Sequence, residues 1–193
     1  AYYYRTHRLR AGRKYLQSHR VGGIVRNMME AKIKNIVQLQ RIITRLKARG
    51  KKIVFTNGCF DILHFGHAKY LKEAKRKGDI LIVGVNSDSS VRKIKGNRRP
   101  LINEAYRAGL IAALESVDFV VIFKEETPFR VIKTLKPDIL AKGADWAQRD
   151  IVGRDFILKG GGKVYTVKLV KNLSSTDLIK KIAKAFLYHS KIL

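Results

Sequence analysis

The sequence predicts an α/β fold in which a doubly wound, Rossmann-like, five-stranded parallel sheet carries helices on both faces. Two observations lead to this prediction. Short apolar runs such as Ile80–Asn86 are continuous rather than alternating, as in strands that are buried on both faces. Segments with apolar residues at three- and four-residue spacing separate these runs, so strands and helices alternate along the chain.

The predicted strands are short and rich in β-branched and aromatic residues. They are Lys52–Thr56, Ile80–Asn86, Phe119–Phe123, Asp138–Ala141 and Val164–Val167. Gly58 follows the first strand and Gly143 follows the fourth, so both are expected to lie in turns where the chain leaves the sheet.

Apolar residues at three- and four-residue spacing predict helices in the segments between and beside these strands. They run from Ile33 to Gly50, from Leu63 to Lys77, from Asn103 to Leu114, from Pro128 to Leu135, near 154–159, and from Ser174 to Phe186. Asn103 is expected to be an N-cap, and Thr127 with Pro128 is expected to supply a cap and a first-turn proline. Residues 91–100 are expected to form a basic loop or a short helix.

Composition limits the class of protein. With 193 residues and 46% hydrophobic content, the chain suits one domain plus extensions. No window approaches the ~18 consecutive apolar residues of a membrane span, and the first residues lack the apolar core of a signal peptide. Cys59 is the single cysteine, which excludes an internal disulfide and fits a reducing compartment. We therefore expect a soluble cytoplasmic protein without a membrane partner.

The formal net charge of +26 makes a polyanionic partner the first alternative to consider. Residues 1–50 contain thirteen Lys and Arg against one acid, Glu30, so much of the excess lies at the start of the chain. The bases in the remainder suit a phosphate-rich small substrate as well as a nucleic acid. A basic nucleic-acid-binding protein therefore stays open as a competing class.

The division expected is a basic, disordered extension over residues 1–29 and one domain over residues 30–193. Three explanations of the extension stay open: an arm that binds nucleic acid, an organellar transit peptide, and a tag or start-site by-product ahead of Met28. Transit peptides are rich in serine, whereas Ser18 stands alone here.

The stretch from Thr56 to His67 combines a strand end, a glycine turn and a helix start. In a parallel sheet this junction lies at the carboxyl ends of the strands, where free N–H groups of a helix favour an anion. His64 and His67 stand there three residues apart. A zinc site needs about three protein ligands, and only Asp61 lies nearby. Phosphate contact is therefore favoured over a metal site or a core role.

The residues from Gly58 to His67 resemble the His-x-Gly-His signature of the nucleotidyltransferase superfamily, within its cytidylyltransferase-like group. Further landmarks over about 150 residues resemble the adenylyltransferase domains of bacterial ADP-heptose synthases. In chain order they are Phe55–Asp61, Val85–Asp88, Lys95–Gly96 with Arg99–Pro100, Ala113–Asp118, Lys142–Asp145 and Ser174–Thr176.

This resemblance implies a reaction: AMP transfer from ATP to D-glycero-beta-D-manno-heptose 1-phosphate, giving ADP-heptose, a lipopolysaccharide core precursor, and pyrophosphate. In such an in-line transfer the protein positions the two substrates and neutralises the charge of their phosphates. Mg²⁺ is expected as an ion that bridges phosphates of the co-substrate ATP, with no metal site made by the protein alone. The same chemistry with CTP and glycerol 3-phosphate, or with another small phosphorylated acceptor, is the nearest alternative.

The resemblance also assigns residues. His64, His67, Lys95 and Arg107 are expected to act on the phosphates. The expected nucleotide contacts are Thr56, Asn57, Gly58, Cys59, Phe60, Asp61, Lys93, Gly143, Ala144, Asp145, Ser175 and Thr176. Two alternatives stay open here: Lys93 as a solvated surface charge, and Ser175 with Thr176 as simple helix N-caps.

The chain departs from the pattern of its relatives in two places. No sugar-kinase domain is seen ahead of the transferase, so a separate kinase is expected to supply the 1-phosphate. The loop before Ser174 lacks the arginine of some cytidylyltransferases, which leaves Lys171 as its candidate substitute. The expected partners are small-molecule substrates rather than nucleic acid, and a homodimer is expected because dimers are common in the superfamily.

Overall fold

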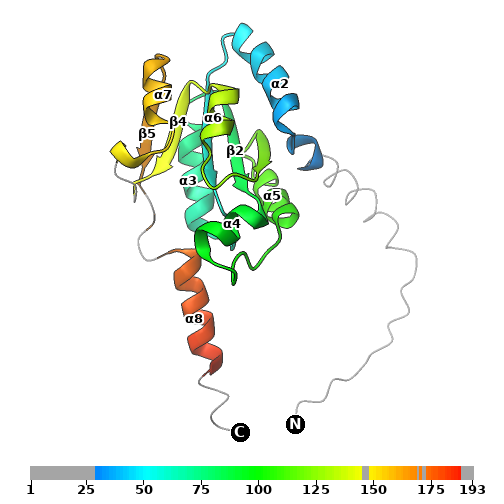
Figure 1. Cartoon of the computed structure of the whole chain (residues 1–193), viewed down its shortest axis with the longest axis vertical. Helices are drawn as coiled ribbons and strands as arrows, with labels where there is room; N and C mark the ends of the chain where they lie inside the picture. The colour runs from blue at the N-terminus through cyan, green and yellow to red at the C-terminus, as the bar shows by residue number, and fades with distance from the viewer. Residues whose placement is uncertain (1–28, 145–147, 169, 171–172, 188–193) are drawn as a thin grey trace, which may run out of the picture.

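Five strands form one parallel sheet in the order β3-β2-β1-β4-β5 (Figure 1). The computed structural model describes residues 29–144, 148–168, 170 and 173–187. The strands are β1 (Ile53–Gly58), β2 (Ile80–Asn86), β3 (Phe119–Phe123), β4 (Ile139–Gly143) and β5 (Lys163–Val167). All five predicted strands are confirmed, with ends that differ by no more than two residues.

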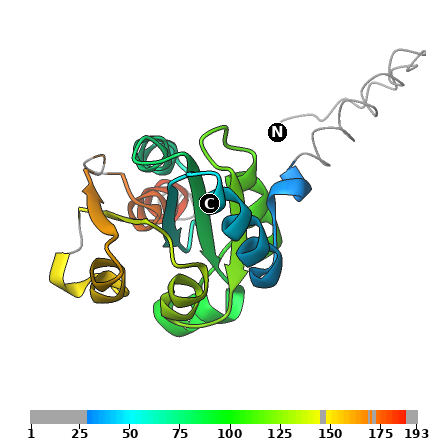
Figure 2. The same ribbon diagram turned by 90° about the horizontal axis from the view of Figure 1, so that it is seen from above.

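Helices connect the strands as the predicted fold class requires. They are α2 (Ile36–Ala48), α3 (Phe65–Lys75), α4 (Asp88–Lys95), α5 (Glu104–Ala112), α6 (Phe129–Leu135), the 3-10 helix η1 (Gln148–Asp150), α7 (Arg154–Lys159) and α8 (Ser175–Leu187). In Figure 2, α3 and α6 lie on opposite faces of the sheet. The prediction of a parallel sheet covered on both sides is confirmed.

Two apolar clusters hold these layers together, one on each face of the sheet. Leu71 of α3 and Ile111 of α5 belong to the first cluster, while Leu39 of α2 and Ile132 of α6 belong to the second. Along β1 the side chains alternate, since Val54 enters the first cluster and its neighbours Ile53 and Phe55 enter the second. The strand is therefore buried on both sides, which explains its unbroken apolar run.

Some helix boundaries differ from the prediction. The first long helix begins at Ile36 rather than Ile33, because Asn35 and Gln38 form a capping box there. The basic stretch near residue 91 is helical and begins at Asp88, where the Ser87 side chain caps α4. Pro128 is the N-cap of α6 rather than its first residue, and Thr127 lies outside the helix. Asn103 caps α5 as predicted.

The strand order sets the location of a ligand site. From β1 the chain moves outward through β2 to β3 and then returns to the other side of β1 to form β4 and β5. Connections therefore leave β1 and β4 in opposite directions, which opens a crevice at their carboxyl ends. Most of the residues predicted to bind nucleotide lie at the ends of β1 and β4 or directly after them.

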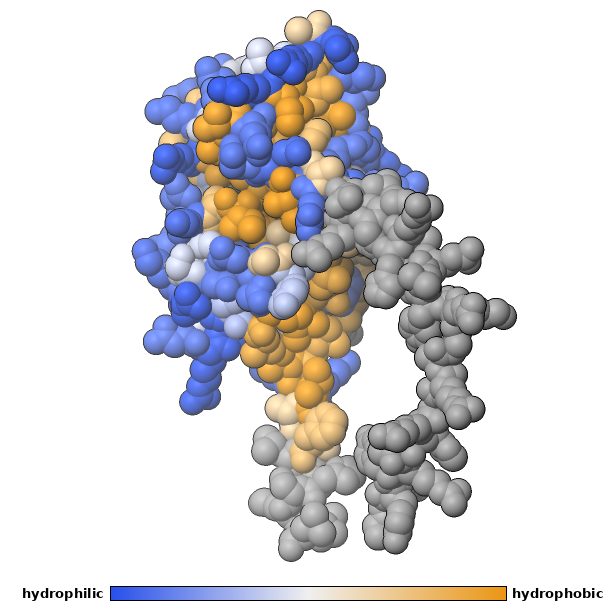
Figure 3. All heavy atoms as spheres, turned by 90° about the vertical axis from the view of Figure 1, so that its right-hand side faces the viewer, coloured by the Kyte–Doolittle hydropathy of each residue, from blue (hydrophilic) through white to orange (hydrophobic). Residues whose placement is uncertain are grey.

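α8 extends away from the sheet (Figure 1) and exposes Ile182 and Phe186, which are 53% and 75% accessible. Figure 3 shows apolar surface continuing down this helix. The homodimer expected from the resemblance stays a prediction. Within the described parts of the chain, no helix has the length and apolar character needed to cross a membrane. Most of the predicted extension, residues 1–28, lies outside the described residues.

Candidate functional site

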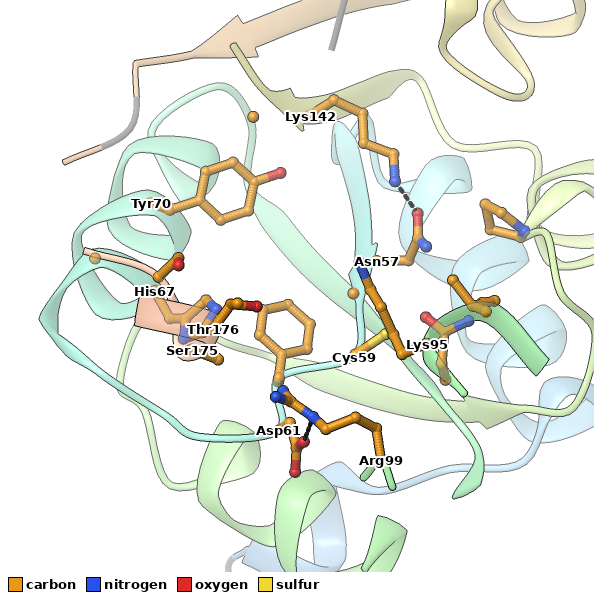
Figure 4. Close-up of a pocket in the computed structure, with 18 of the residues that line it drawn as sticks. Asn57, Cys59, Asp61, His67, Tyr70, Lys95, Arg99, Lys142, Ser175 and Thr176 are labelled. Carbon is orange, nitrogen blue, oxygen red and sulfur yellow. Dashed lines mark hydrogen bonds and ion pairs between the residues drawn. The ribbon is translucent and has the colours of Figure 1, made fainter. Parts of the chain in front are cut away.

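A cavity of about 680 Å³ opens at the carboxyl ends of β1 and β4. The close-up in Figure 4 shows side chains from both strands, from α3 and α4, and from the start of α8 around it. The predicted site residues that line it are Asn57, Gly58, Cys59, Phe60, Asp61, His64, His67, Lys95, Gly143, Ser175 and Thr176. Residues far apart in the sequence thus meet at the edge where the fold class predicts a ligand.

His64 and His67 form a stacked pair at the start of α3. Their ring centroids lie 3.8 Å apart with an interplanar angle of 22°, and the ring of Phe60 meets His67 edge-on at 5.2 Å. A Cβ atom at Gly66 would lie 3.0 Å from the His64 ring, so the glycine between the histidines leaves room for this ring. The spacing of the motif therefore builds a compact pair of imidazoles.

Three nitrogens of this pair are buried without a hydrogen-bond partner among the described residues: His64 Nδ1, His64 Nε2 and His67 Nδ1. His64 occupies the N-cap position of α3, but its side chain makes no capping hydrogen bond. Buried polar atoms are normally paired, since an unpaired one costs about 1–3 kcal/mol. Orphaned imidazole nitrogens that line a cavity are suited to hydrogen bonds with a polar ligand.

Burial lowers the pKa of His67 to about 4, and repulsion from His64 adds to this effect. Burial also lowers the pKa of His64 below its ordinary value. In the free protein near pH 7 both rings are therefore neutral, and each carries one N–H donor and one acceptor nitrogen. The pair can donate hydrogen bonds to phosphate oxygens but adds no permanent charge.

The loop after β1 approaches the cavity with its backbone. Phe60 has a φ of +48°, in the left-handed region that residues with a Cβ seldom adopt. A Cβ at Gly58 would come within 3.1 Å of the Phe60 ring, so this glycine lets the loop fold tightly. Burial raises the pKa of the Cys59 thiol, although Lys95 and Arg107 nearby oppose the shift. A protonated Cys59 is unsuited to nucleophilic catalysis.

Asp61, which was predicted to contact the nucleotide, lines the cavity and is also paired within the protein. Its carboxylate is 1% exposed and forms an ion pair with Arg99 Nε at 2.5 Å. The other oxygen accepts hydrogen bonds from the backbone N–H groups of Leu101 and Ile102, at 2.7 and 3.0 Å. Through these contacts Asp61 holds the loop between α4 and α5 against the cavity, and its contact with a nucleotide stays a prediction.

Arg107 was predicted to act on the phosphates, and its position corrects that prediction. The side chain is fully buried and does not line the cavity. Its guanidinium donates to the carbonyl oxygens of Ile102 and Cys59 and pairs with Asp88 Oδ1 at 2.7 Å. Because its donors are used within the protein, Arg107 supports the loop that carries Cys59 instead of reaching a ligand.

Three other predicted contacts also lie outside the lining. Thr56 is buried, and its hydroxyl bonds to Tyr70 Oη at 2.6 Å. Lys93 is 63% exposed and lies 3.6 Å from Glu126, which agrees with the open alternative of a surface charge. Ala144 donates its N–H to the carbonyl of Val167 in the β5 strand. Asp145 and Lys171 lie outside the described residues.

Ser175 and Thr176 lie at the start of α8, but the N-cap of this helix is another residue. The hydroxyl of Ser174 accepts the N–H of Asp177, so Ser174 caps the helix. Ser175 donates to the carbonyl of Ile62 at 3.1 Å, and Thr176 is exposed. Both still line the cavity at a helix N-terminus, where an anion is favoured.

The lining residues that were not among the predicted site residues include two cations, Lys142 and Arg99. Lys142, the last but one residue of β4, donates from Nζ to Asn57 Oδ1 across the strand pair. Arg99 lines the cavity from the loop between α4 and α5. The available signals were a charged residue at the end of an apolar strand for Lys142 and, for Arg99, its place in the Arg99–Pro100 landmark of the resemblance.

The described residues contain no group of three His, Cys, Asp or Glu side chains that could hold a metal ion. Two carboxylates line the cavity, Asp61 and Glu126, and the first is committed to Arg99. Mg²⁺ commonly keeps several waters and takes its remaining ligands from substrate phosphates and one or two carboxylates. The donor set fits an ion that arrives with a nucleotide, with Glu126 as its available carboxylate.

The cavity and the sheet define an α/β domain with a candidate ligand site at the carboxyl ends of its strands, and its family follows from comparison. The family described as Cytidylyltransferase-like matches residues 55–181, and the chain belongs to this family. Among curated relatives, the bifunctional protein HldE of Geobacter metallireducens is 55% identical over 81% of this chain and 32% of its own length. HldE of Aliarcobacter butzleri is 51% identical over 78% of this chain and 31% of its own. The chain thus spans about a third of these relatives.

Two solved structures share the fold of this chain. The lipopolysaccharide core biosynthesis protein of Thermoplasma volcanium is 36% identical, with a TM-score of 0.53, over 63% of this chain and 98% of that one. A pantoate-beta-alanine ligase from Francisella tularensis has a TM-score of 0.55 over 76% of this chain and 74% of its own. At 20% identity, this second likeness shows the fold alone.

Proposed function

We propose that this domain transfers AMP from ATP to the phosphate of D-glycero-beta-D-manno-heptose 1-phosphate, giving ADP-heptose and pyrophosphate. Membership of the cytidylyltransferase-like family supports the reaction class. About 50% identity to proteins named bifunctional protein HldE supports the choice of substrates. The likeness to a lipopolysaccharide core biosynthesis protein supports the use of the product in that pathway.

The observation that carries the proposal is the pair of unpartnered imidazoles at His64 and His67. Neutral N–H donors in a partly buried cavity suit a triphosphate, because they stabilise charge that grows on the leaving pyrophosphate. Ser175 and Thr176 add hydroxyl groups at the N-terminus of α8. Lys95 adds a positive charge from α4.

In the proposed reaction, an oxygen of the acceptor phosphate attacks the α-phosphorus of ATP in line. The bond between the α-phosphorus and the bridging oxygen breaks, and pyrophosphate leaves with the electron pair. No covalent enzyme intermediate is needed, and the protein contributes orientation and charge neutralisation. The Cys59–Phe60 loop and Asn57, held by Lys142, form the wall that would orient the α-phosphate.

Mg²⁺ is part of the proposal as an ion held by the nucleotide phosphates. It would neutralise charge on the triphosphate when bound, and Glu126 is the side chain available to contact it or its waters.

A sugar kinase activity must supply the 1-phosphate. Because the reaction consumes ATP, we propose that the protein works in the cytoplasm.

The nearest alternative is cytidylyl transfer to glycerol 3-phosphate or another small phosphorylated acceptor. A pyrophosphate-release assay tests both by pairing ATP and CTP with heptose 1-phosphates and glycerol 3-phosphate in the presence of Mg²⁺. We expect turnover with ATP and the heptose 1-phosphate. Turnover only with CTP and glycerol 3-phosphate would contradict the proposal. A protein that binds nucleic acid would instead show no pyrophosphate release and salt-sensitive binding that survives His64→Ala.

A further inference from the structure

Arg99 is the one arginine among the described residues that line the cavity. It lies in the loop between α4 and α5, and its side chain is 19% exposed. The guanidinium is ionised at every pH at which the protein is folded. This position gives the cavity a permanent positive charge that the neutral imidazoles do not provide.

Asp61 holds this guanidinium by one edge. The carboxylate lies 2.5 Å from Arg99 Nε and is itself anchored by the amides of Leu101 and Ile102. Neither terminal nitrogen of Arg99 makes a hydrogen bond with another described residue. Figure 4 shows the Arg99 head group beside Asp61 in the cavity. A guanidinium that is fixed at Nε keeps two terminal nitrogens available, and these match two oxygens of a phosphate.

The proposed reaction brings two anions together, since both the triphosphate and the acceptor phosphate are negative. Three cations among the described residues line the cavity, Lys95, Arg99 and Lys142, and Lys142 donates to Asn57. Arg107 is fully buried and its donors are used, and Lys93 is directed to Glu126 at the surface. Among the cations of the lining, Arg99 is the one whose head group is paired with a buried carboxylate.

In-line transfer separates the two anions on either side of the α-phosphorus, because the attacking oxygen lies opposite the leaving pyrophosphate. In the view of Figure 4, His67, Ser175 and Thr176 lie on one side of the cavity, Lys95 lies on the other, and the Arg99 head group lies between them beside Asp61. If the imidazoles and the start of α8 bind the pyrophosphate end, the acceptor phosphate lies farther from them, within reach of the Arg99 head group.

We propose that Arg99 binds the phosphate of the acceptor substrate, and that Asp61 is the positioning residue that orients it. This inference rests on the proposed function only in requiring a phosphorylated acceptor, whichever nucleotide and acceptor the enzyme uses. It gives the acceptor a binding residue separate from those that hold the triphosphate.

The test compares Arg99→Gln with Arg98→Gln, because Arg98 is an exposed neighbour outside the cavity lining. Steady-state kinetics would measure KM for the acceptor and KM for the nucleotide separately. We expect Arg99→Gln to raise the acceptor KM about 10- to 100-fold, as for a lost charge-assisted phosphate contact, and to change the nucleotide KM less than about threefold. Arg98→Gln should leave both values close to those of the parent protein.

Arg99→Lys keeps the positive charge but loses the planar guanidinium that can donate two parallel hydrogen bonds. We therefore expect its acceptor KM to lie between those of the parent protein and Arg99→Gln. Binding of a non-hydrolysable ATP analogue to each variant checks that the cavity is intact. An unchanged acceptor KM in Arg99→Gln, or an equal rise in both KM values, would overturn the inference. If the parent protein uses CTP and glycerol 3-phosphate, the proposed function fails while the acceptor effect is still expected. If it uses no phosphorylated acceptor, both proposals fail.

Discussion

The two edges of the sheet use polar side chains in opposite ways. At the amino edge, three aspartates each accept a backbone N–H at or beside the start of a strand: Asp79 from Lys52, Asp138 from Ile53 and Asp118 from Leu81. Each also lies within 4 Å of a lysine ammonium group. At the carboxyl edge, imidazole nitrogens of His64 and His67 are buried without a partner among the described residues.

This difference indicates what each edge is for. Polar groups that the protein satisfies itself stabilise the fold, whereas polar groups left unsatisfied cost stability and persist where a ligand completes them. Substitutions at the two edges should therefore separate activity from stability.

The largest expected effect is the loss of activity at the carboxyl edge. His64→Ala and His67→Ala should each lower kcat by about 100- to 1000-fold, because each removes a donor to the charge that develops on the leaving pyrophosphate. Initial rates of pyrophosphate release would measure this effect. The free energy of unfolding at pH 7.5 should change little, since neither imidazole is satisfied in the free protein. A variant with near-normal kcat would argue against the role of the pair.

A smaller and opposite effect is expected at the amino edge. Asp118→Ala removes the acceptor of the Leu81 N–H, at 2.6 Å, and the partner of Lys75. We expect the free energy of unfolding to fall by about 1–3 kcal/mol, because a strand amide loses its partner. Denaturant titration would measure the change, and kinetics at 25 °C should be close to normal.

Asp155→Ala is the matched control for this variant. Asp155 is 79% exposed, and among the described residues its ion pair is with its neighbour Arg154, so its loss should change stability by no more than about 0.5 kcal/mol. If both variants lost the same free energy of unfolding, the contacts of Asp118 at the start of β2 would contribute no more to stability than an exposed ion pair.

The comparison also shows what the sequence could predict. Strands β1 and β2 were predictable because parallel strands buried on both faces read as unbroken apolar runs. The partly buried edge strand β5 was predictable from its β-branched and aromatic residues. The two histidines were predictable because a short motif brings them to the first turn of one helix. The role of Arg107 was not, since its burial depends on Asp88 and on the Cys59 carbonyl, which reach it only in the folded chain.

The position of Arg99 also depends on a residue that is distant in the sequence. Arg98 and Arg99 are adjacent, yet one is exposed and the other is drawn into the cavity by Asp61, 38 positions earlier in the chain. No local pattern carries that pairing. Site residues at the ends of helices and strands can therefore be predicted from local motifs. A residue such as Arg99, which is positioned by a carboxylate far away in the sequence, is harder to predict.

The smallest expected effect is a pH dependence of stability at the carboxyl edge. The pKa of His67 is about 4 in the folded protein and near 6.5 in an unfolded chain. Between these values the unfolded chain binds a proton that the folded protein does not, so stability should fall as the pH is lowered from about 6.5 toward 4. At pH 5 we expect a loss of about 1–2 kcal/mol from this group. Denaturant titrations of the parent protein and His67→Asn at pH 7.5 and pH 5 would isolate it, because the variant lacks the titrating ring. A bound triphosphate should reduce the loss in the parent protein, since an anion beside the ring favours its protonated form. Equal losses in the two proteins would mean that the His67 ring is not held neutral by the fold.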